Sequence, residues 1–164
     1  MPREIERKFL VVNDDWRNEA GSGKRFEQAI VFSNGDRTVR IRVVDGQKAS
    51  LTMKIGIGGS AMSRHEFEYS VPVSDAEELL NLAHGNRITK TRYEVARGDH
   101  VWEIDVYNGK LKGLVVAEVE MKSEDDKPAL PSWLGRELTG DKRFSNQALA
   151  EGSLGDDWRD GLQD

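Results

Sequence analysis

Pairs of like charges recur at alternate positions in the apolar segments of this chain. Residues 39–43 read Val-Arg-Ile-Arg-Val, and residues 117–121 read Ala-Glu-Val-Glu-Met. Because successive side chains of a β-strand point to opposite faces, each such strand would have one apolar face and one face with two like charges. Like charges on one face repel each other unless opposite charges lie beside them or across from them. The pattern therefore favours a curved sheet that brings its charged faces together.

Alternation of this kind predicts about eight strands, joined by short turns that contain glycine, asparagine or aspartate. The alternating segments are residues 5–11, 26–32, 39–43, 51–55, 67–71, 93–95, 102–106 and 115–121. Closing the sheet on itself would place the charged faces in one lumen. The expected fold is thus a β-rich α+β fold, a closed eight-stranded antiparallel β-barrel, or tunnel, with a few flanking helices.

Two segments depart from the strand pattern. Residues 73–82 are predicted to be a helix, with Ser74 as the N-cap and Glu77 completing a capping box. Residues 132–150 are expected to form short helical turns. Residues 1–150 are expected to be a single tunnel domain, followed at 151–164 by an acidic C-terminal tail that is poorly ordered.

The composition excludes several classes of protein. The chain has 24 basic and 29 acidic residues, a net charge of −5, which argues against a general nucleic-acid binder. It has no cysteine, which excludes disulfides, thiolate zinc sites and a cysteine nucleophile. No apolar run reaches the length of a membrane span, and the N-terminus has no apolar signal core. We expect a cytoplasmic protein that binds neither nucleic acid nor membranes.

The charged strand faces are sorted by sign. Their basic residues are Lys8, Arg40, Arg42, Lys54, Arg64, Lys90 and Arg92, and their acidic residues are Glu4, Glu6, Glu66, Glu68, Glu103, Asp105, Glu118 and Glu120. Clustered arginines and lysines bind phosphate oxygens, whereas clustered carboxylates hold hard divalent cations. The set therefore favours a polyanion bound together with a cation. The alternative is a solvated sheet face with cross-strand salt bridges.

Residues 4–10, Glu-Ile-Glu-Arg-Lys-Phe-Leu, resemble the N-terminal E-x-E-x-K signature of the CYTH superfamily, the triphosphate tunnel metalloenzymes. The remaining motifs follow in family order: R-x-R at 40–42, Lys54, E-x-E at 66–68, K-x-R at 90–92, acidic pairs at 103–105 and 118–120, and D-K-R-F-x-N at 141–146. The resemblance covers residues 2–150 and implies an eight-stranded antiparallel β-tunnel. One departure is Ile30, where related bacterial proteins often have a tyrosine.

The resemblance implies a role for each charged group. The phosphate-binding residues would be Lys8, Arg40, Arg42, Lys54, Lys90, Arg92 and Arg143. The ligands of Mg²⁺ or Mn²⁺ would be Glu4, Glu6, Glu118 and Glu120, with Glu103 and Asp105 either on the cation as well or next to its ligands. The catalytic candidates are Lys54, Glu66 and Glu68. Lys54 would contact the terminal phosphate or the attacking water, or act as a base. Glu66 and Glu68 would orient water, bind a second metal ion or hold arginine and lysine side chains in place. For Arg143, an ion pair with Asp141 at a helix end is an equally good interpretation.

The predicted function is metal-dependent hydrolysis of a triphosphate, with inorganic triphosphate as the leading substrate. The alternatives are a class IV adenylyl cyclase, a thiamine or nucleoside triphosphatase, and a non-catalytic module that binds polyphosphate or a nucleotide. The intact acidic pairs favour an enzyme, because a pure anion binder gains little from them. The expected partner is a small-molecule triphosphate, and the chain is expected to be a monomer or a homodimer.

Overall fold

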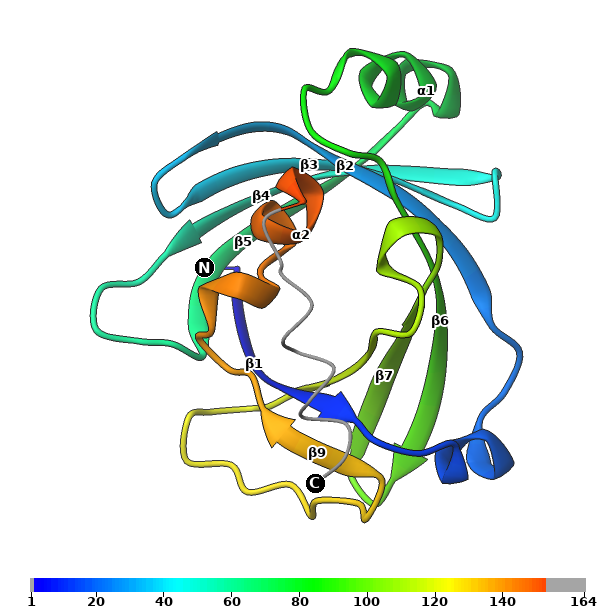
Figure 1. The fold of residues 1–164 in the computed structure, drawn as a ribbon. Coiled ribbons are helices and arrows are strands. Elements are labelled where there is room, and N and C mark those ends of the chain that lie inside the picture. Colours follow the sequence, from blue (N-terminus) through cyan, green and yellow to red (C-terminus); the bar gives the residue numbers. More distant parts are fainter. Residues whose placement is uncertain (1, 153–164) are drawn as a thin grey trace.

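The computed structural model describes residues 2–152, and of Asn146, Gln147 and Glu151 it describes only the backbone. Nine antiparallel strands form one curved sheet in the order β5-β4-β3-β2-β6-β7-β8-β1-β9 (Figure 1). The strands are β1 (Arg3–Val11), β2 (Lys24–Asn34), β3 (Arg37–Val44), β4 (Lys48–Gly56), β5 (Ser63–Val71), β6 (Ile88–Arg97), β7 (His100–Tyr107), β8 (Val115–Glu120) and β9 (Leu134–Glu137). The helices are α1 (Val73–Leu82) and α2 (Asn146–Glu151), with 3-10 turns η1 (Asp15–Glu19), η2 (Gly109–Leu111) and η3 (Lys142–Phe144).

The two ends of the strand order meet at β1. Arg3–Ile5 pair with β5, Glu6–Leu10 pair with β8, and Phe9 and Val11 pair with β9. The sheet is therefore β-rich and antiparallel as predicted, but it has nine strands instead of eight. Its edges join over only three residue pairs between β1 and β5. On that edge of β1, Glu6–Lys8 lie between the β5 and β9 pairings, and we call these three residues the fork.

The apolar face of the sheet points outward and is covered by small elements. Trp16 of η1 and Trp133 of the loop before β9 are almost completely buried against the outer face of β6–β8. Trp133 packs edge-on against Trp102, with ring centroids 5.7 Å apart. Such burial lets the sheet keep its charged residues on the inner face.

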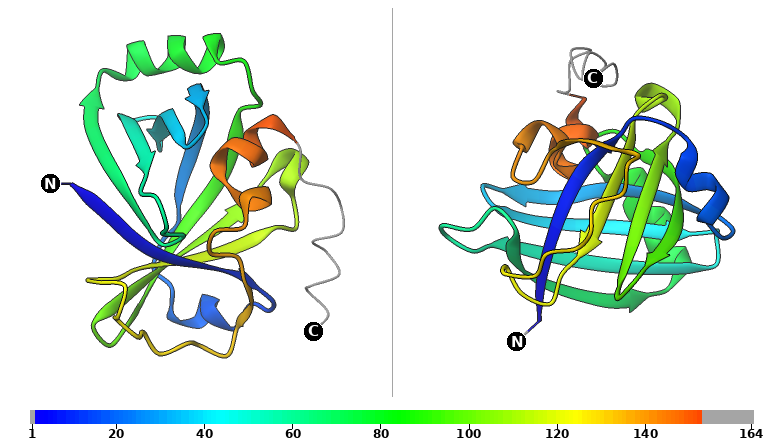
Figure 2. Two further views of the ribbon diagram at one scale, coloured as in Figure 1. Left: turned by 90° about the vertical axis from the view of Figure 1, so that its left-hand side faces the viewer. Right: turned by 90° about the horizontal axis from the view of Figure 1, so that it is seen from below.

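One end of the interior is apolar. Leu10, at the end of β1, packs with Phe144 of η3 and Leu149 of α2 in a single buried cluster. Ile30, where a tyrosine was expected, packs against the same cluster. Figures 1 and 2 show η3 and α2 at this end of the curved sheet, with α1 on its outer side.

Helix α1 has the predicted bounds but a different N-cap. Pro72 occupies the cap position in an extended conformation, and its carbonyl accepts the first helical hydrogen bond from Ala76 N–H. Ser74 lies inside the first turn and no side chain caps the helix, so the predicted capping box is wrong. Proline fixes φ near the value that the chain needs here, and the helix can therefore begin at Val73.

The prediction for residues 132–150 is only partly confirmed. Residues 142–151 do form the helical elements η3 and α2, but Leu134–Glu137 form strand β9. This strand shows no alternation that could reveal it, because it has four residues and includes a glycine. The backbone of Gly135 lies so close to the Val12 side chain that a Cβ at position 135 would clash with Val12 Cγ1, and this position therefore requires glycine. The predicted tail at 151–164 lies outside the described residues, apart from the backbone of Glu151 and Gly152.

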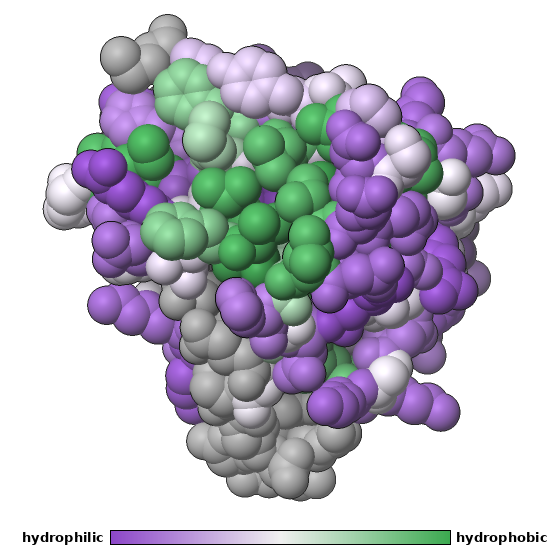
Figure 3. Space-filling view, turned by 90° about the horizontal axis from the view of Figure 1, so that it is seen from above, coloured by the Kyte–Doolittle hydropathy of each residue, from purple (hydrophilic) through white to green (hydrophobic). Residues whose placement is uncertain are grey.

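Part of the outer face of β2–β5 stays uncovered beside α1. Phe32 is 62% exposed, Tyr69 54% and Met53 37%. Figure 3 shows apolar side chains gathered at the centre of this face, with hydrophilic ones around them. Within residues 2–152, no helix combines the length and the apolar composition that a membrane crossing requires.

Candidate active site

The inner face of the sheet holds most of the charged residues that the sequence predicted. Arg40, Arg42, Lys90 and Asp105 are only 1–8% exposed. Charged groups are rarely buried to this degree unless they are paired or bind a ligand. The arrangement of their partners therefore decides what this face can bind.

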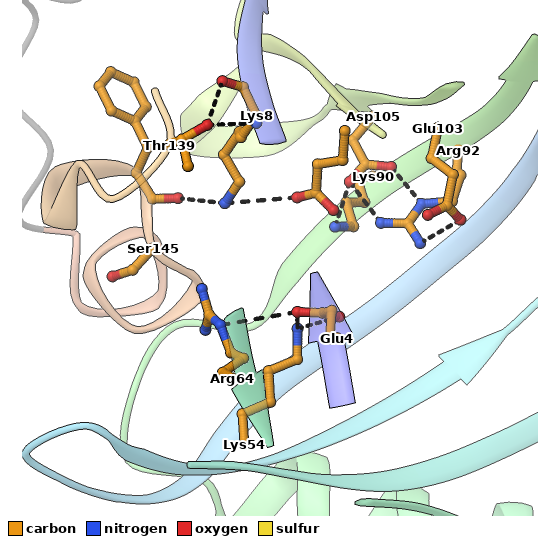
Figure 4. Close-up of polar contacts among 12 residues, drawn as sticks. Glu4, Lys8, Lys54, Arg64, Lys90, Arg92, Glu103, Asp105, Thr139 and Ser145 are labelled. Atoms are coloured by element: carbon orange, nitrogen blue, oxygen red, sulfur yellow. Dashed lines mark hydrogen bonds and ion pairs between the residues drawn. The ribbon is translucent and has the colours of Figure 1, made fainter. Parts of the chain in front are cut away.

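A compact ion-pair cluster lies on β6 and β7. Lys90 Nζ lies 2.7 Å from Asp105 Oδ2, and Arg92 Nε lies 2.7 Å from Asp105 Oδ1 (Figure 4). Burial alone would raise the pKa of Asp105, but Arg92 and Lys90 outweigh it and hold the pKa well below its usual range. Burial lowers the pKa of Lys90 to about 7, although Asp105 opposes the shift. This geometry favours a role for Asp105 in positioning Lys90 and Arg92 over the predicted role as a metal ligand.

Three basic side chains surround the Phe26 ring. The Arg42 and Arg92 guanidinium carbons lie 4.6 and 4.8 Å from its centroid, and Lys90 Nζ lies 5.9 Å away. Burial lowers the pKa of Arg42 to about 9, and the neighbouring Arg40 and Arg92 add to the shift. A bound anion would stabilise the charge of Arg42, which burial and the neighbouring arginines disfavour.

Arg40 has a further donor that is not satisfied. Its Nη2 donates weakly to Thr52 Oγ1 at 3.4 Å, but no atom of the described residues accepts a hydrogen bond from its buried Nε. A buried donor without an acceptor costs free energy, which a ligand oxygen can recover.

The sequence reasoning missed several inward residues that support the basic groups. Arg42 Nε donates to Gln28 Oε1 at 2.9 Å, Thr52 bridges Arg40 to Glu68, and Phe26 lies among the cations. Each could have been found from strand parity. Gln28 pairs with Arg42 across β2 and β3, and Thr52 is two residues before Lys54.

Lys54 lies between two carboxylates on neighbouring strands. Its Nζ is 3.1 Å from Glu4 Oε1 and 3.5 Å from Glu66 Oε2, and Arg64 Nε lies 3.8 Å from Glu4. Burial raises the pKa of Glu4, and a hydrogen bond with Glu66 raises it further. The predicted catalytic pair Lys54 and Glu66 is thus in direct contact. Glu68 stands apart from it and accepts from Thr52 Oγ1 at 3.4 Å.

Glu6 is partly buried and, like the exposed Glu68 and Glu120, has no basic group within ion-pair distance among the described residues. Burial raises its pKa to about 8, and the Glu118 and Glu4 carboxylates add to the shift. Glu118, in contrast, lies 3.5 Å from Lys8 Nζ. Burial opposes ionisation of Glu118, but Lys8 and then Arg92 lower its pKa to about 2. Among the described residues no basic group lies within ion-pair distance of Glu6, so a cation would suit this position.

Whether this face can hold a divalent cation depends on which of its carboxylates are available as ligands. Three further predicted ligands contact basic groups: Glu4 contacts Lys54, while Glu103 and Asp105 contact Arg92. Glu120 is exposed at the end of β8, opposite Glu6. Within residues 2–152, no three carboxylate or imidazole groups already stand together at metal-ligand distances. Oxygen donors of the right kind are present, and Glu6 is the one whose burial a cation would offset most directly.

A cavity of about 780 Å³ opens beside Glu6 and Lys8. Lys54 and Arg64 line it from β4 and β5, and the loops at 56–62 and 138–141 form its rim. Its size suits a small phosphate compound. Arg143 does not line it: its Nη2 lies 2.9 Å from Asp141 Oδ2 in an exposed pair, as the helix-end interpretation of Arg143 predicts.

The raised pKa of Glu6 predicts that the metal-free protein loses stability between about pH 5 and about pH 7. A carboxyl group whose pKa is higher in the folded state contributes its full stability below its unfolded pKa, and that contribution is lost as pH rises from the ordinary value of 4.5 to the folded value of about 8. Lys90, whose folded pKa is about 7, makes the protein more stable as pH rises, but only above pH 7. Glu118 makes the stability rise with pH only below its unfolded pKa, so neither group cancels the fall between pH 5 and pH 7. Urea unfolding in chelator should show the fall, and Mg²⁺ should reduce it. Equal slopes in chelator and Mg²⁺ would contradict a cation at Glu6.

Comparison with known proteins agrees with this geometry. A family model described as the CYTH domain matches residues 2–149. The chain belongs to the CYTH family. This CYTH chain is 39% identical over 152 residues to an inorganic triphosphatase of Acetivibrio thermocellus, covering 92% of this chain and 95% of the relative. It is 37% identical over 150 residues to an inorganic triphosphatase of Nitrosomonas europaea, covering 90% and 96%.

Solved structures share the CYTH fold. The crystal structure of the inorganic triphosphatase NE1496 aligns with a TM-score of 0.62 and 32% identity, covering 90% of this chain and 97% of that chain. The PH1012 protein of Pyrococcus horikoshii aligns with a TM-score of 0.60 over 74% and 80% of the two chains. Its identity of 18% shows the likeness of fold alone.

Proposed function

We propose that this CYTH protein hydrolyses inorganic triphosphate with a divalent cation, Mg²⁺ or Mn²⁺, as cofactor. The observation that carries the proposal is the crowding of the buried Arg40 and Arg42 and the largely buried Arg92 on one inner face, with an unsatisfied Arg40 donor. Two relatives at 37% and 39% identity are named inorganic triphosphatases, which supports this choice of substrate.

The basic residues of the inner face would bind the phosphate oxygens through charge-assisted hydrogen bonds. In this proposal the curved sheet acts as a closed tunnel, with the substrate chain along its interior. Lys54 would contact the terminal phosphate from the cavity, and Glu66 beside it would orient the attacking water. A bound divalent cation would neutralise charge on the phosphate oxygens as the terminal bond breaks.

The acidic groups would divide into two sets. Glu6 and Glu118, with Glu4 and Glu120 beside them, are the proposed cation ligands. Asp105 would hold Lys90 and Arg92 in place for the phosphates. Cytoplasmic localisation and a monomeric or homodimeric state stay predictions.

A phosphate-release panel tests this function. Inorganic triphosphate, ATP and thiamine triphosphate would each be supplied with Mg²⁺, with Mn²⁺ and with chelator. We expect inorganic triphosphate to be hydrolysed at least about tenfold faster than the others, and chelator to abolish the reaction. Binding without turnover would instead support a phosphate-binding module, and formation of cyclic AMP from ATP would support a cyclase.

The double variant Glu118→Gln with Glu120→Gln tests the acidic set in the same assay. It removes two neighbouring oxygen ligands and is expected to lose the metal-dependent activity by at least about a hundredfold. Its control is Glu78→Gln, which neutralises an exposed carboxylate on α1, on the outer side of the sheet. Unchanged metal-dependent turnover in the double variant would refute the assignment of these ligands.

A further inference from the structure

The backbone of Lys8 is held in an unusual way. Lys8 is the last residue of the fork, where the edge of β1 has left β5 and has not yet joined β9. Its carbonyl accepts from Leu138 N–H at 2.7 Å, but its own N–H donates to a side chain, Thr139 Oγ1, at 3.0 Å. A threonine hydroxyl thus takes the place of the strand carbonyl that this N–H would normally meet.

The Thr139 hydroxyl is oriented by a second residue. Thr139 Oγ1 lies 2.7 Å from Glu137 Oε2. A hydroxyl has one proton, so Thr139 accepts from Lys8 and donates to Glu137 when both contacts are made. The hydrogen bond from Arg7 holds the pKa of Glu137 below its usual range, and this carboxylate therefore remains an acceptor at neutral pH.

Arg7 holds the far end of this chain of contacts. Its Nε and Nη2 donate to the two oxygens of Glu137 at 2.9 and 2.8 Å, a bidentate geometry. Arg7 is a charged residue on the outward, apolar parity of β1, between Ile5 and Phe9, and its guanidinium lies 5.0 Å from the Phe9 centroid. The pair with Glu137 explains why a charge stands at this position.

The contacts reach the cavity through Lys8. Thr139 and Lys8 both line the cavity, and Lys8 Nζ lies 3.5 Å from Glu118 and 3.3 Å from the Phe144 carbonyl (Figure 4). The position of this ammonium group depends on the position and orientation of the Lys8 backbone, to which its side chain is attached. On one edge Lys8 pairs with Glu118 of β8. On the other edge Leu138 N–H holds its carbonyl and the Thr139 hydroxyl holds its N–H, so loss of that hydroxyl would release one of the two backbone contacts at the fork.

We propose that Thr139 is a positioning residue for Lys8, and that the Arg7–Glu137 pair keeps the Thr139 hydroxyl in its accepting orientation. These contacts act through Lys8 on the binding of inorganic triphosphate. The inference rests on the proposed function, because it gives Lys8 its phosphate-binding role.

Thr139→Val and Thr139→Ser form the central test. Valine keeps the shape but removes the hydroxyl, and we expect KM for inorganic triphosphate to rise about tenfold while kcat changes by less than about threefold. Serine keeps the hydroxyl and is expected to retain KM within about twofold. An unchanged KM in Thr139→Val, or an equal rise in Thr139→Ser, would overturn the proposal. Melting temperatures of both variants exclude a mere loss of folding.

Arg7→Met tests the outer pair against a matched control. Arg97→Met breaks a similar exposed ion pair, in which Arg97 Nη2 lies 2.7 Å from Glu19 Oε2 far from Lys8. We expect Arg7→Met to raise KM about threefold to fivefold and Arg97→Met to leave it unchanged. Equal effects of the two variants on KM would show that Arg7 acts only on general stability.

A double-mutant cycle with Lys8→Ala shows whether Thr139 acts through Lys8. Calorimetric binding of inorganic triphosphate is the readout, so the cycle does not depend on turnover. In the Lys8→Ala background, Thr139→Val should cause no further loss of affinity, and a full loss there would refute the proposal. Failure of the wild-type protein to hydrolyse any triphosphate would refute the proposed function, whereas the cycle would still decide the role of Thr139.

Discussion

Replacement of Glu6 by glutamine is expected to reduce turnover of inorganic triphosphate by at least about a hundredfold and to stabilise the metal-free protein. The two effects have one cause. Burial raises the pKa of Glu6 to about 8 beside two further carboxylates, so at neutral pH the metal-free protein must protonate Glu6 when it folds, which costs free energy. Glutamine is neutral without that cost, but it also removes the carboxylate ligand. A residue that binds a ligand at the expense of stability shows these two effects together when it is replaced: the protein becomes more stable and loses turnover.

Glu6→Gln would be compared with Glu78→Gln, a change at an exposed carboxylate of α1. Urea unfolding in chelator gives the stability, with an expected gain of about 1 kcal/mol for Glu6→Gln and none for Glu78→Gln. Phosphate release with Mg²⁺ gives the turnover. Loss of both stability and turnover in Glu6→Gln would mean that Glu6 supports the fold and does not ligate a cation.

Asp105→Asn is expected to lower the free energy of unfolding by about 3 kcal/mol, because it leaves Lys90 and Arg92 buried without their shared carboxylate. Asp105 is 1% exposed and contacts both of them at 2.7 Å. The pKa of Lys90, already lowered to about 7 by burial, should fall further when the opposing carboxylate is lost. Lys90, which is mostly charged at pH 6 in the wild type, would then be largely neutral at that pH, and KM for inorganic triphosphate should rise about tenfold there.

The pH dependence separates this effect from simple unfolding. At pH 8 Lys90 is already mostly neutral in the wild type, so the rise in KM caused by Asp105→Asn should be smaller than at pH 6. Glu19→Gln is the control, because Glu19 pairs with Arg97 at the surface and should contribute less than about 0.5 kcal/mol. A KM for Asp105→Asn that is raised equally at both pH values would contradict the role assigned to Lys90.

Strand parity accounts for most of what the sequence predicts correctly. Arg40 with Arg42, and Lys90 with Arg92, share the inner face as their spacing predicts, because side-chain direction alternates locally along a strand. Parity could not reveal β9, whose four residues have no alternating pattern, or the cap of α1, where Pro72 displaced the better capping residue Ser74. Those features depend on single backbone positions.

Parity also could not separate the roles of similar acids. Glu6 and Asp105 both lie in acidic motifs of inward parity, yet the pKa of Glu6 is raised and that of Asp105 is lowered. The difference comes from the register between strands: Asp105 pairs directly with Arg92, whereas Glu6 pairs with Glu120. Thr139 was likewise hidden, because it meets Lys8 from 131 residues further along the chain.

The place of β1 in the sheet determines when the interior can be completed during synthesis. Strands β2 to β8 can pair as they are made, since each finds a partner among the strands already present or the next to follow. β1 is made first, but its main partner β8 ends at Glu120. The chain between β1 and β8 is long, and contacts across such a long segment form slowly. Until β8 is made, β1 stays unpaired along the edge that β8 will occupy. A nascent chain shorter than this carries Glu4, Glu6 and Lys8 but has not yet enclosed them, so activity should emerge only with the last third of the polypeptide.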